Sequence, residues 1–214
     1  MTLSSGAKTQ AMPAPYEMRP LRTEQDRDAV AELLAQRTQW LIDHNLIPPY
    51  LGDAAVLYRE QWVDAVALFE GGLPAGCLRL NRQPALPYWS AESDEPSLLV
   101  SLAYTAPGRK SDMIGRLMTL WAQHFARRAG MTWVRCEVPS GAPSSDGSLR
   151  LVDHLKDGCG WQFVRSLKDT DNRPLTLLQL PATPRPGLEA LIHCAVPLHP
   201  AANVTEEPVR SEAG

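Results

Sequence analysis

Long hydrophobic runs, cysteine and an excess of charge of either sign are all scarce in this sequence. The longest apolar stretches, such as Leu98–Ala103, have the length of a strand and fall far short of the roughly 20 residues that cross a membrane. The 21 basic and 24 acidic residues leave a net charge of −3, so the chain as a whole has no basic field with which to grip nucleic acid. We expect neither a membrane nor a nucleic-acid partner.

The few cysteines lack the spacing of a metal site or a redox motif. The four, with no CxxC pair among them, are Cys77, Cys136, Cys159 and Cys194. Free thiols of this kind are typical of the reducing cytoplasm. Residues 1–15 also lack the apolar segment of a signal peptide, so we expect a cytoplasmic protein without a bound metal.

The composition is that of an ordinary globular domain, with 44% hydrophobic and 21% charged residues in a chain of 214. Small and polar residues predict a disordered leader over 1–15. Six prolines predict a C-terminal tail over 181–214, with one short helical turn at 188–192. The folded domain is expected to cover 16–180.

Strand and helix periods alternate along the predicted domain. Thr23 is expected to cap the first helix and Gly71-Gly72 to turn a hairpin. The apolar residues of 97–105 do not alternate with polar ones, which predicts a buried strand. Strands are predicted at 16–21, 63–70, 73–80, 97–105, 133–138, 161–166 and 175–180, and helices at 23–44, 54–62, over about 17 residues after Gly108, and at 148–156. This order predicts an α/β (α+β mixed) fold in which helices pack on a mixed sheet.

The segment 97–116 runs from a buried strand through a loop directly into the start of a helix. A helix N-terminus offers unpaired N–H groups and the positive end of the helix dipole, which together suit a diphosphate. Arg109 and Lys110 add positive charge to the loop. From these residues alone, an ordinary strand–loop–helix connection remains the alternative.

The same segment resembles the acetyl-CoA signature of the GNAT N-acetyltransferases. That signature is a strand, Val-x-Pro, then Arg or Gln, two residues, Gly, one residue, Gly or Ala, and a long helix. Pro107 matches the proline, Lys110 the Arg or Gln, and Gly115 the second glycine, whereas Thr105 replaces the usual Val and Met113 the first glycine. A glycine there lets the backbone approach the diphosphate, so the side chain of Met113 is expected to point away.

A second stretch, 148–161, resembles the family's Asn-x-x-Ala-x-x-x-Tyr-x-x-x-Gly-Phe. Ser148 stands at the Asn position, Leu151 at the Ala position and Leu155 at the Tyr position. The sequence around 40–41 and 61–62 also resembles that of actinobacterial members. The resemblance covers 16–180 and implies one domain with a mixed six- to seven-stranded sheet, splayed middle strands and about four helices.

The resemblance implies a site for acetyl-CoA, as co-substrate, where strands 97–105 and 133–138 part. Pantetheine would pair with the backbone near Ala103 and Thr105, and the diphosphate would lie on amides of 110–115. The cofactor-binding residues implied in this way are Ala103, Thr105, Lys110, Ser111, Asp112, Met113, Ile114, Gly115, Arg116 and Ser148.

The catalytic residues are less well defined. The family's acid is the tyrosine that Leu155 replaces, and Leu155 cannot donate a proton, so the neighbouring His154 is a candidate; a surface or packed histidine is the alternative. Glu137 is a candidate base or a plain strand carboxylate, and Tyr104 lies beside the thioester or is an ordinary strand aromatic. Weaker candidates are, as bases, Asp43, His44, Asp94 and Glu95 and, as pocket lining, Trp40, Trp62, Tyr88 and Trp89.

The activity expected from the resemblance is transfer of an acetyl group to a primary amine of a small molecule, by direct attack without a covalent enzyme intermediate. Two alternatives stay open. Leu155 and Met113 favour a CoA-binding module that has lost catalysis, and a protein N-terminus or lysine is another acceptor. A homodimer is one option for the oligomeric state.

Overall fold

A single sheet of eight strands organises the molecule, in the order β6-β7-β5-β4-β3-β2-β1-β8. The computed structural model describes residues 14–46, 48, 50, 52–59, 64–89, 94–108, 111–139 and 151–199. The strands are β1 (Tyr16–Pro20), β2 (Asp64–Glu70), β3 (Leu73–Asn81), β4 (Ser97–Thr105), β5 (Trp133–Pro139), β6 (Gln162–Lys168), β7 (Pro174–Pro181) and β8 (Ile192–Cys194). The pairs β4–β5 and β1–β8 are parallel, and the other pairs are antiparallel.

The helices are α1 (Glu24–Asp43), α2 (Ala54–Arg59), α3 (Ser111–Arg128) and a helix over 151–159 that is π-helical at His154–Gly158. The predicted cap of α1 is confirmed, because the hydroxyl of Thr23 accepts the Asp26 N–H at 3.1 Å. The predicted hairpin is confirmed as well: Gly71 and Gly72 have φ of 59° and 86°, which glycine adopts most readily.

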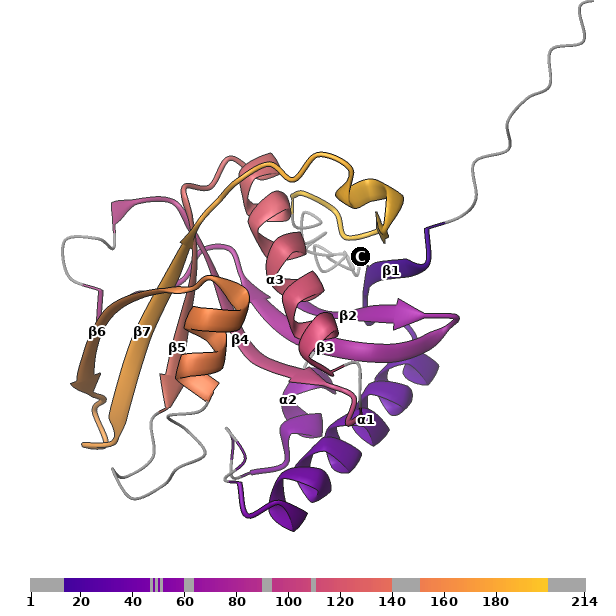
Figure 1. Cartoon of the computed structure of the whole chain (residues 1–214), viewed down its shortest axis with the longest axis horizontal. Coiled ribbons are helices and arrows are strands. Elements are labelled where there is room, and N and C mark those ends of the chain that lie inside the picture. Colours follow the sequence, from indigo (N-terminus) through magenta and orange to yellow (C-terminus); the bar gives the residue numbers. More distant parts are fainter. Residues whose placement is uncertain are drawn as a thin grey trace, which may run out of the picture.

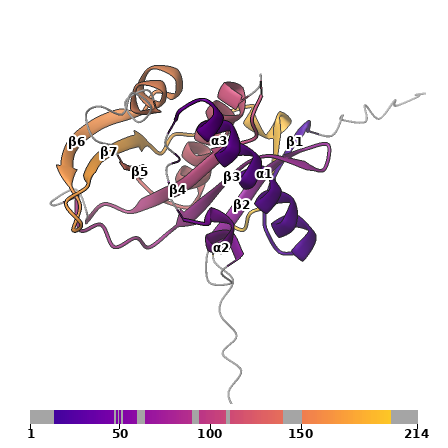
Figure 2. The ribbon, with the colours of Figure 1, turned by 90° about the horizontal axis from the view of Figure 1, so that it is seen from below.

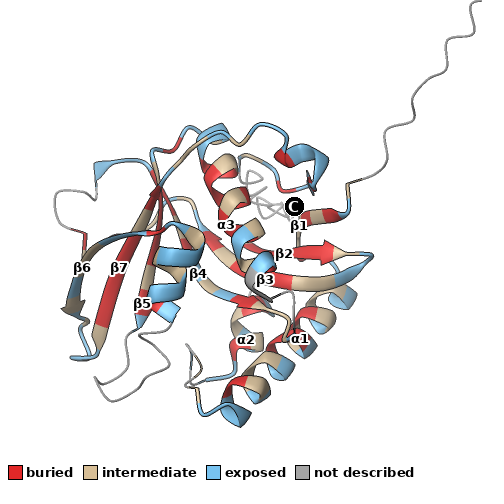
Figure 3. Ribbon diagram, viewed as in Figure 1, coloured by how far each residue is buried: buried red, intermediate tan, exposed pale blue. Residues whose placement is uncertain are grey.

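The two faces of the sheet carry separate apolar cores. On the face that we call the front, α3 packs with Ile114, Met118 and Phe125, and the 151–159 helix lies beside it (Figure 1). On the back face, α1 and α2 cover a second cluster. A third cluster on the back face joins residues of β7 and β6 to the segment that follows β3. The middle strands are accordingly among the most buried segments (Figure 3).

The eighth strand comes from the segment that the sequence predicted as a tail, so the sheet has one strand more than the six or seven expected. Leu188, Ile192 and Val196 are buried in the front core, and the segment lies alongside β1 (Figure 2). A 3₁₀ helix at Leu188–Ala190 occupies the place of the expected helical turn. Among the helices that the structure describes, none combines the length and the hydropathy that a membrane span needs.

Candidate functional site

The two middle strands of the sheet part from one another. β4 and β5 pair only where Ser97–Leu99 lie beside Trp133–Arg135. Beyond these residues β4 continues along β3, and β5 continues along β7 over its whole length. The splay that the resemblance implied is therefore present. It gives the second half of β4 an edge that no described residue of β5 covers.

Solvent reaches β4 at this parting. Ser101 and Ala103 are both exposed, although β4 is fourth in a sheet of eight strands, where side chains are normally covered on both faces. Leu98 and Val100, just before them on the same strand, are buried in the front core. The centre of the sheet thus holds an open stretch of backbone rather than a closed core.

A β-bulge shapes the open stretch. Cys77 pairs with Tyr104 and Arg79 with Ser101, so Leu102 and Ala103 together lie opposite one residue of β3. Leu102 has a φ of 48°, which is uncommon for a residue other than glycine. The hydroxyl of Tyr58, from α2, donates to the Leu102 carbonyl and is itself buried. Because a bulge re-aims the backbone around it, Tyr58 holds the peptide groups of this stretch in one orientation.

The N-terminus of α3 lies next to the open end of β4. A Cβ placed on Gly115 would meet one atom outside its own helix, the Thr105 Cγ2 at 3.9 Å, so the first turns of α3 face β4 with space between them. The side chain of Met113 is 44% exposed, and its orientation away from a diphosphate stays a prediction. Ile114 is buried in the front core, so its side chain anchors the first turns of α3 on the sheet.

A carboxylate lies on the back face of β5 at the parting. Glu137 is half-buried, and its Oε1 accepts a hydrogen bond from the indole N–H of Trp89 at 2.9 Å. Burial raises the pKa of Glu137, and the bond from Trp89 acts in the opposite direction. Arg135, fully buried on the same face, holds its guanidinium 4.7 Å from the centre of the Trp89 ring. Trp89 therefore fixes the orientation of the carboxylate.

The sequence and the fold were compared with those of known proteins. No protein-family model matches the sequence, and no curated protein matches it at a significant level. Solved structures do match. A protein of the GNAT family of acetyltransferases from Desulfovibrio desulfuricans is 18% identical with a TM-score of 0.57, over 78% of this chain and 99% of that one. The chain has the GNAT fold.

Two further structures with this fold are similar over nearly their whole length. The aminoglycoside N(6')-acetyltransferase from Legionella pneumophila is 12% identical with a TM-score of 0.54, over 80% of this chain and 94% of that one. An aminoglycoside 6'-N-acetyltransferase complexed with coenzyme A is 13% identical with a TM-score of 0.53, over 79% and 98%. At these identities the likeness describes the fold.

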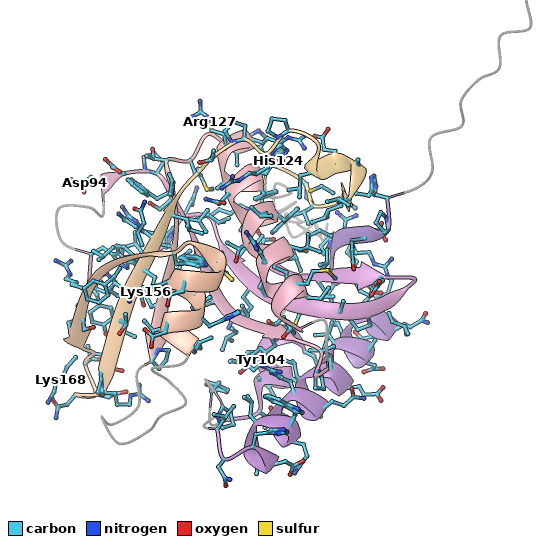
Figure 4. All side chains as sticks on the ribbon, viewed as in Figure 1. Asp94, Tyr104, His124, Arg127, Lys156 and Lys168 are labelled. Carbon is cyan, nitrogen blue, oxygen red and sulfur yellow. The ribbon has the colours of Figure 1, made fainter. Side chains whose placement is uncertain are left out.

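Tyr104, which was predicted to lie beside the thioester, is in the back core of this GNAT fold (Figure 4). It is 4% exposed, and its hydroxyl has no hydrogen-bond partner among the described residues. Burial raises the pKa of Tyr104 to about 12, and burial likewise raises the pKa of the neighbouring Cys77 to about 12. Both groups are therefore protonated at neutral pH. The catalytic role of Tyr104 stays a prediction.

His154 lies within the π-helical turn, where the sequence predicted an ordinary helix. Its side chain is exposed, and its Nε2 lies 3.9 Å from the sulfur of Cys159. Leu155, at the position of the family tyrosine, packs against the front core. Nothing in this arrangement aims the imidazole at the parting, so its role as an acid stays a prediction.

The other candidate bases lie away from the parting. Glu95 accepts a hydrogen bond from the indole of Trp133 and, with Asp94, precedes the end of β4 at which the two middle strands are still paired. His44 caps the end of α1 and stacks on Trp40 with ring centres 4.0 Å apart. The predicted site residues that lie outside the described residues are Arg109, Lys110 and Ser148, together with Trp62 and the side chains of Ser111 and Asp112.

Two residues of the site were missed at the sequence level: Tyr58 and Ser101. A serine in the middle of the apolar run 98–104 was a usable signal, because a hydroxyl in a central strand must be exposed to solvent or hydrogen-bonded. The hydrogen bond between Tyr58 and Leu102 joins residues 44 positions apart, so no local sequence pattern predicts it.

Proposed function

We propose that the protein is an acetyl-CoA-dependent N-acetyltransferase that acts on a primary amine of a small molecule. One observation carries the proposal: the exposed, bulged half of β4 lies at a parting of the sheet, directly beside the N-terminus of α3. Backbone donors for a carbonyl and backbone donors for a diphosphate are thereby next to one another. The complexes of similar folds with acetyl-CoA and with coenzyme A support this choice of co-substrate.

The residues present suit acetyl-CoA. The first turns of α3 offer N–H groups at the positive end of the helix dipole, and the space beside Gly115 lets a phosphate approach the backbone. We expect the side chain of Met113, which is 44% exposed, to leave that approach open. Bound there, acetyl-CoA would supply an activated acetyl group in the form of a thioester.

The backbone N–H groups of the β4 bulge are the groups in this chain that would stabilise the transition state. Attack on a thioester carbonyl places negative charge on its oxygen, and backbone N–H groups held in position stabilise that charge. Tyr58, by bonding the Leu102 carbonyl, keeps the N–H groups of the bulge from reorienting. We assign Tyr58 a positioning role, since it acts through the backbone of β4.

Glu137 is the residue that we assign to proton removal. The neutral amine nitrogen forms a bond to the acetyl carbon, the carbon–sulfur bond breaks, one amine proton passes to Glu137, and the thiolate that leaves takes a proton from water. A carboxylate whose pKa is raised by burial is a better base near neutral pH than an exposed one. The hydrogen bond from the Trp89 indole N–H holds the Glu137 carboxylate in one orientation.

A binding module without catalysis is the second candidate, and it is favoured by one observation. No acidic or phenolic side chain stands at the position of Leu155, and the adjacent His154 lies against Cys159 instead. Such a module would bind acetyl-CoA in the same place and release no thiol.

Two measurements test the proposal. Acetyl-CoA should raise the melting temperature, because a ligand that binds only the folded state stabilises it. Release of free CoA thiol, followed with a thiol reagent across a library of primary amines, should then exceed the rate without amine. A melting temperature that does not move at millimolar acetyl-CoA would refute the cofactor site. A shift with no thiol release from any amine would favour the binding module.

A further inference from the structure

Three polar side chains form one row across the back face at the parting. Arg79 of β3 pairs with Ser101 of β4. Leu99 pairs with Arg135, so two residues further along each strand Ser101 and Glu137 stand at the same level on either side of the gap. We call Arg79, Ser101 and Glu137 the polar row.

Strand alternation puts all three on the same face. Arg79 lies two residues from Cys77, which packs in the back core under α1 and α2. Ser101 lies two residues from Leu99, which packs against the third cluster on that face, and Glu137 contacts Trp89 of the same cluster. The polar row therefore separates two apolar clusters, and polar side chains between such clusters are a recurrent feature of ligand sites.

The polar row is accessible. Ser101 is exposed, and Arg79 and Glu137 are each partly exposed. The positive charge of Arg79 lowers the pKa of the Tyr58 hydroxyl, against the larger effect of burial, which raises it. A cation and a carboxylate thus flank the open stretch of β4 from opposite strands.

We propose that the acceptor is an amino acid or a similar small zwitterion, with its amine at Glu137 and its carboxylate at Arg79 and Ser101. This inference rests on the proposed acetyl transfer and names its substrate class. A guanidinium binds a carboxylate through paired, charge-assisted hydrogen bonds, and the hydroxyl of Ser101 adds a third donor.

The spacing of the strands agrees with a small molecule. Neighbouring strands lie about 4.8 Å apart, so the backbones of Arg79 and Glu137 are separated by at least two such steps, roughly 10 Å. The long Arg79 side chain covers part of this distance. A molecule that carries amine and carboxylate on one carbon spans the remainder, whereas a polyamine would place a second cation against the guanidinium.

Matched pairs of acceptors test the inference in the unaltered protein. Each pair consists of an amino acid and the amine obtained by removing its carboxylate, such as phenylalanine with phenethylamine and lysine with cadaverine. We expect kcat/KM for the amino acid to exceed that for its partner by about tenfold or more, as for other charge-assisted hydrogen bonds. Equal or better use of the decarboxylated amines would overturn the inference.

Single-residue variants test whether Arg79 causes the preference for the amino acid over its matched amine. Arg79→Gln should raise KM for the amino acid at least about tenfold, so that the ratio of kcat/KM between the two members of a pair falls to about one. Arg79→Lys should restore part of the preference. Arg127→Gln, at an exposed position in the last turn of α3, is the control and should leave the preference intact. A preference that survives in a folded Arg79→Gln would refute the role of Arg79.

The two proposals fail in different ways. No melting shift with acetyl-CoA, or no thiol release from any amine, contradicts the proposed function itself. A melting shift and thiol release that show no difference between the members of a pair contradict the substrate class alone.

Discussion

Replacing Tyr58 by Phe isolates the contribution of the bulge. The phenyl ring keeps the packing of Tyr58 in the back core. The substitution removes the hydroxyl, and with it the hydrogen bond to the Leu102 carbonyl and the contact with the Cys77 thiol. The carbonyl is then partly buried without that donor. The N–H groups of the bulge lose the contact that fixes their orientation.

The structure sets the size of both effects. Loss of one buried hydrogen bond that leaves its acceptor half-buried lowers the free energy of unfolding by about 1–2 kcal/mol. In a domain of this size that corresponds to a fall in melting temperature of about 3–6 °C. Removing an oxyanion donor outright lowers kcat by about 100- to 1000-fold. Here the donors stay but lose their alignment, so we expect a fall in kcat of about tenfold, with KM for acetyl-CoA nearly unchanged.

A second tyrosine provides the matched control. Tyr16, buried on β1, donates its hydroxyl to Glu70 at 3.3 Å, away from the parting. Tyr16→Phe should lower the melting temperature by a similar amount and leave kcat as it is. Thermal melts and initial rates of thiol release on the two variants make the comparison. If Tyr58→Phe melts earlier but retains full kcat, the hydroxyl is structural only and the reasoning about the bulge is refuted.

Three further substitutions follow from the same geometry. Trp89→Phe removes the bond that lowers the pKa of Glu137, so the acidic limb of the rate–pH profile should move to higher pH; an unmoved limb would exclude Glu137 as the base. Gly115→Ala adds a methyl group that, among the described residues, meets the Thr105 Cγ2 at 3.9 Å. It should stabilise the helix by up to about 1 kcal/mol yet weaken acetyl-CoA binding, and tighter or equal binding by calorimetry would contradict a phosphate at that position. Gly76→Ala places a Cβ 2.5 Å from the Met118 sulfur, so it should destabilise by about 1–3 kcal/mol as α3 is pushed from the sheet; chemical denaturation measures this, and an unchanged midpoint would disprove close packing there.

The sequence predicted well where one local pattern determined the outcome. The strand at 97–105 has the predicted bounds because its apolar residues do not alternate with polar ones and a proline lies beyond each end. The cap at Thr23 was predictable because its hydroxyl acts on a backbone N–H three residues away. The splay of β4 and β5 came from the family resemblance, since no pattern within either strand indicates that they separate.

Other features were out of reach because distant residues determine them. β8 is three residues long and prolines lie nearby, so only its pairing with β1 makes it a strand. The bulge depends on the left-handed φ of Leu102 and on a hydroxyl from α2. The polar row exists only through the register of three strands. In the sequence, Ser101 stands out within an apolar run, whereas Arg79 and Glu137 resemble polar residues at any surface position of a strand.

A crystal structure of the protein with coenzyme A tests the central claim most directly. The account predicts the diphosphate on backbone N–H groups in the first turns of α3, beside Gly115, and the thiol end between β4 and β5 at the level of Ala103. Coenzyme A bound elsewhere on the surface, or β4 and β5 closed together in the complex with no ligand between them, would contradict it.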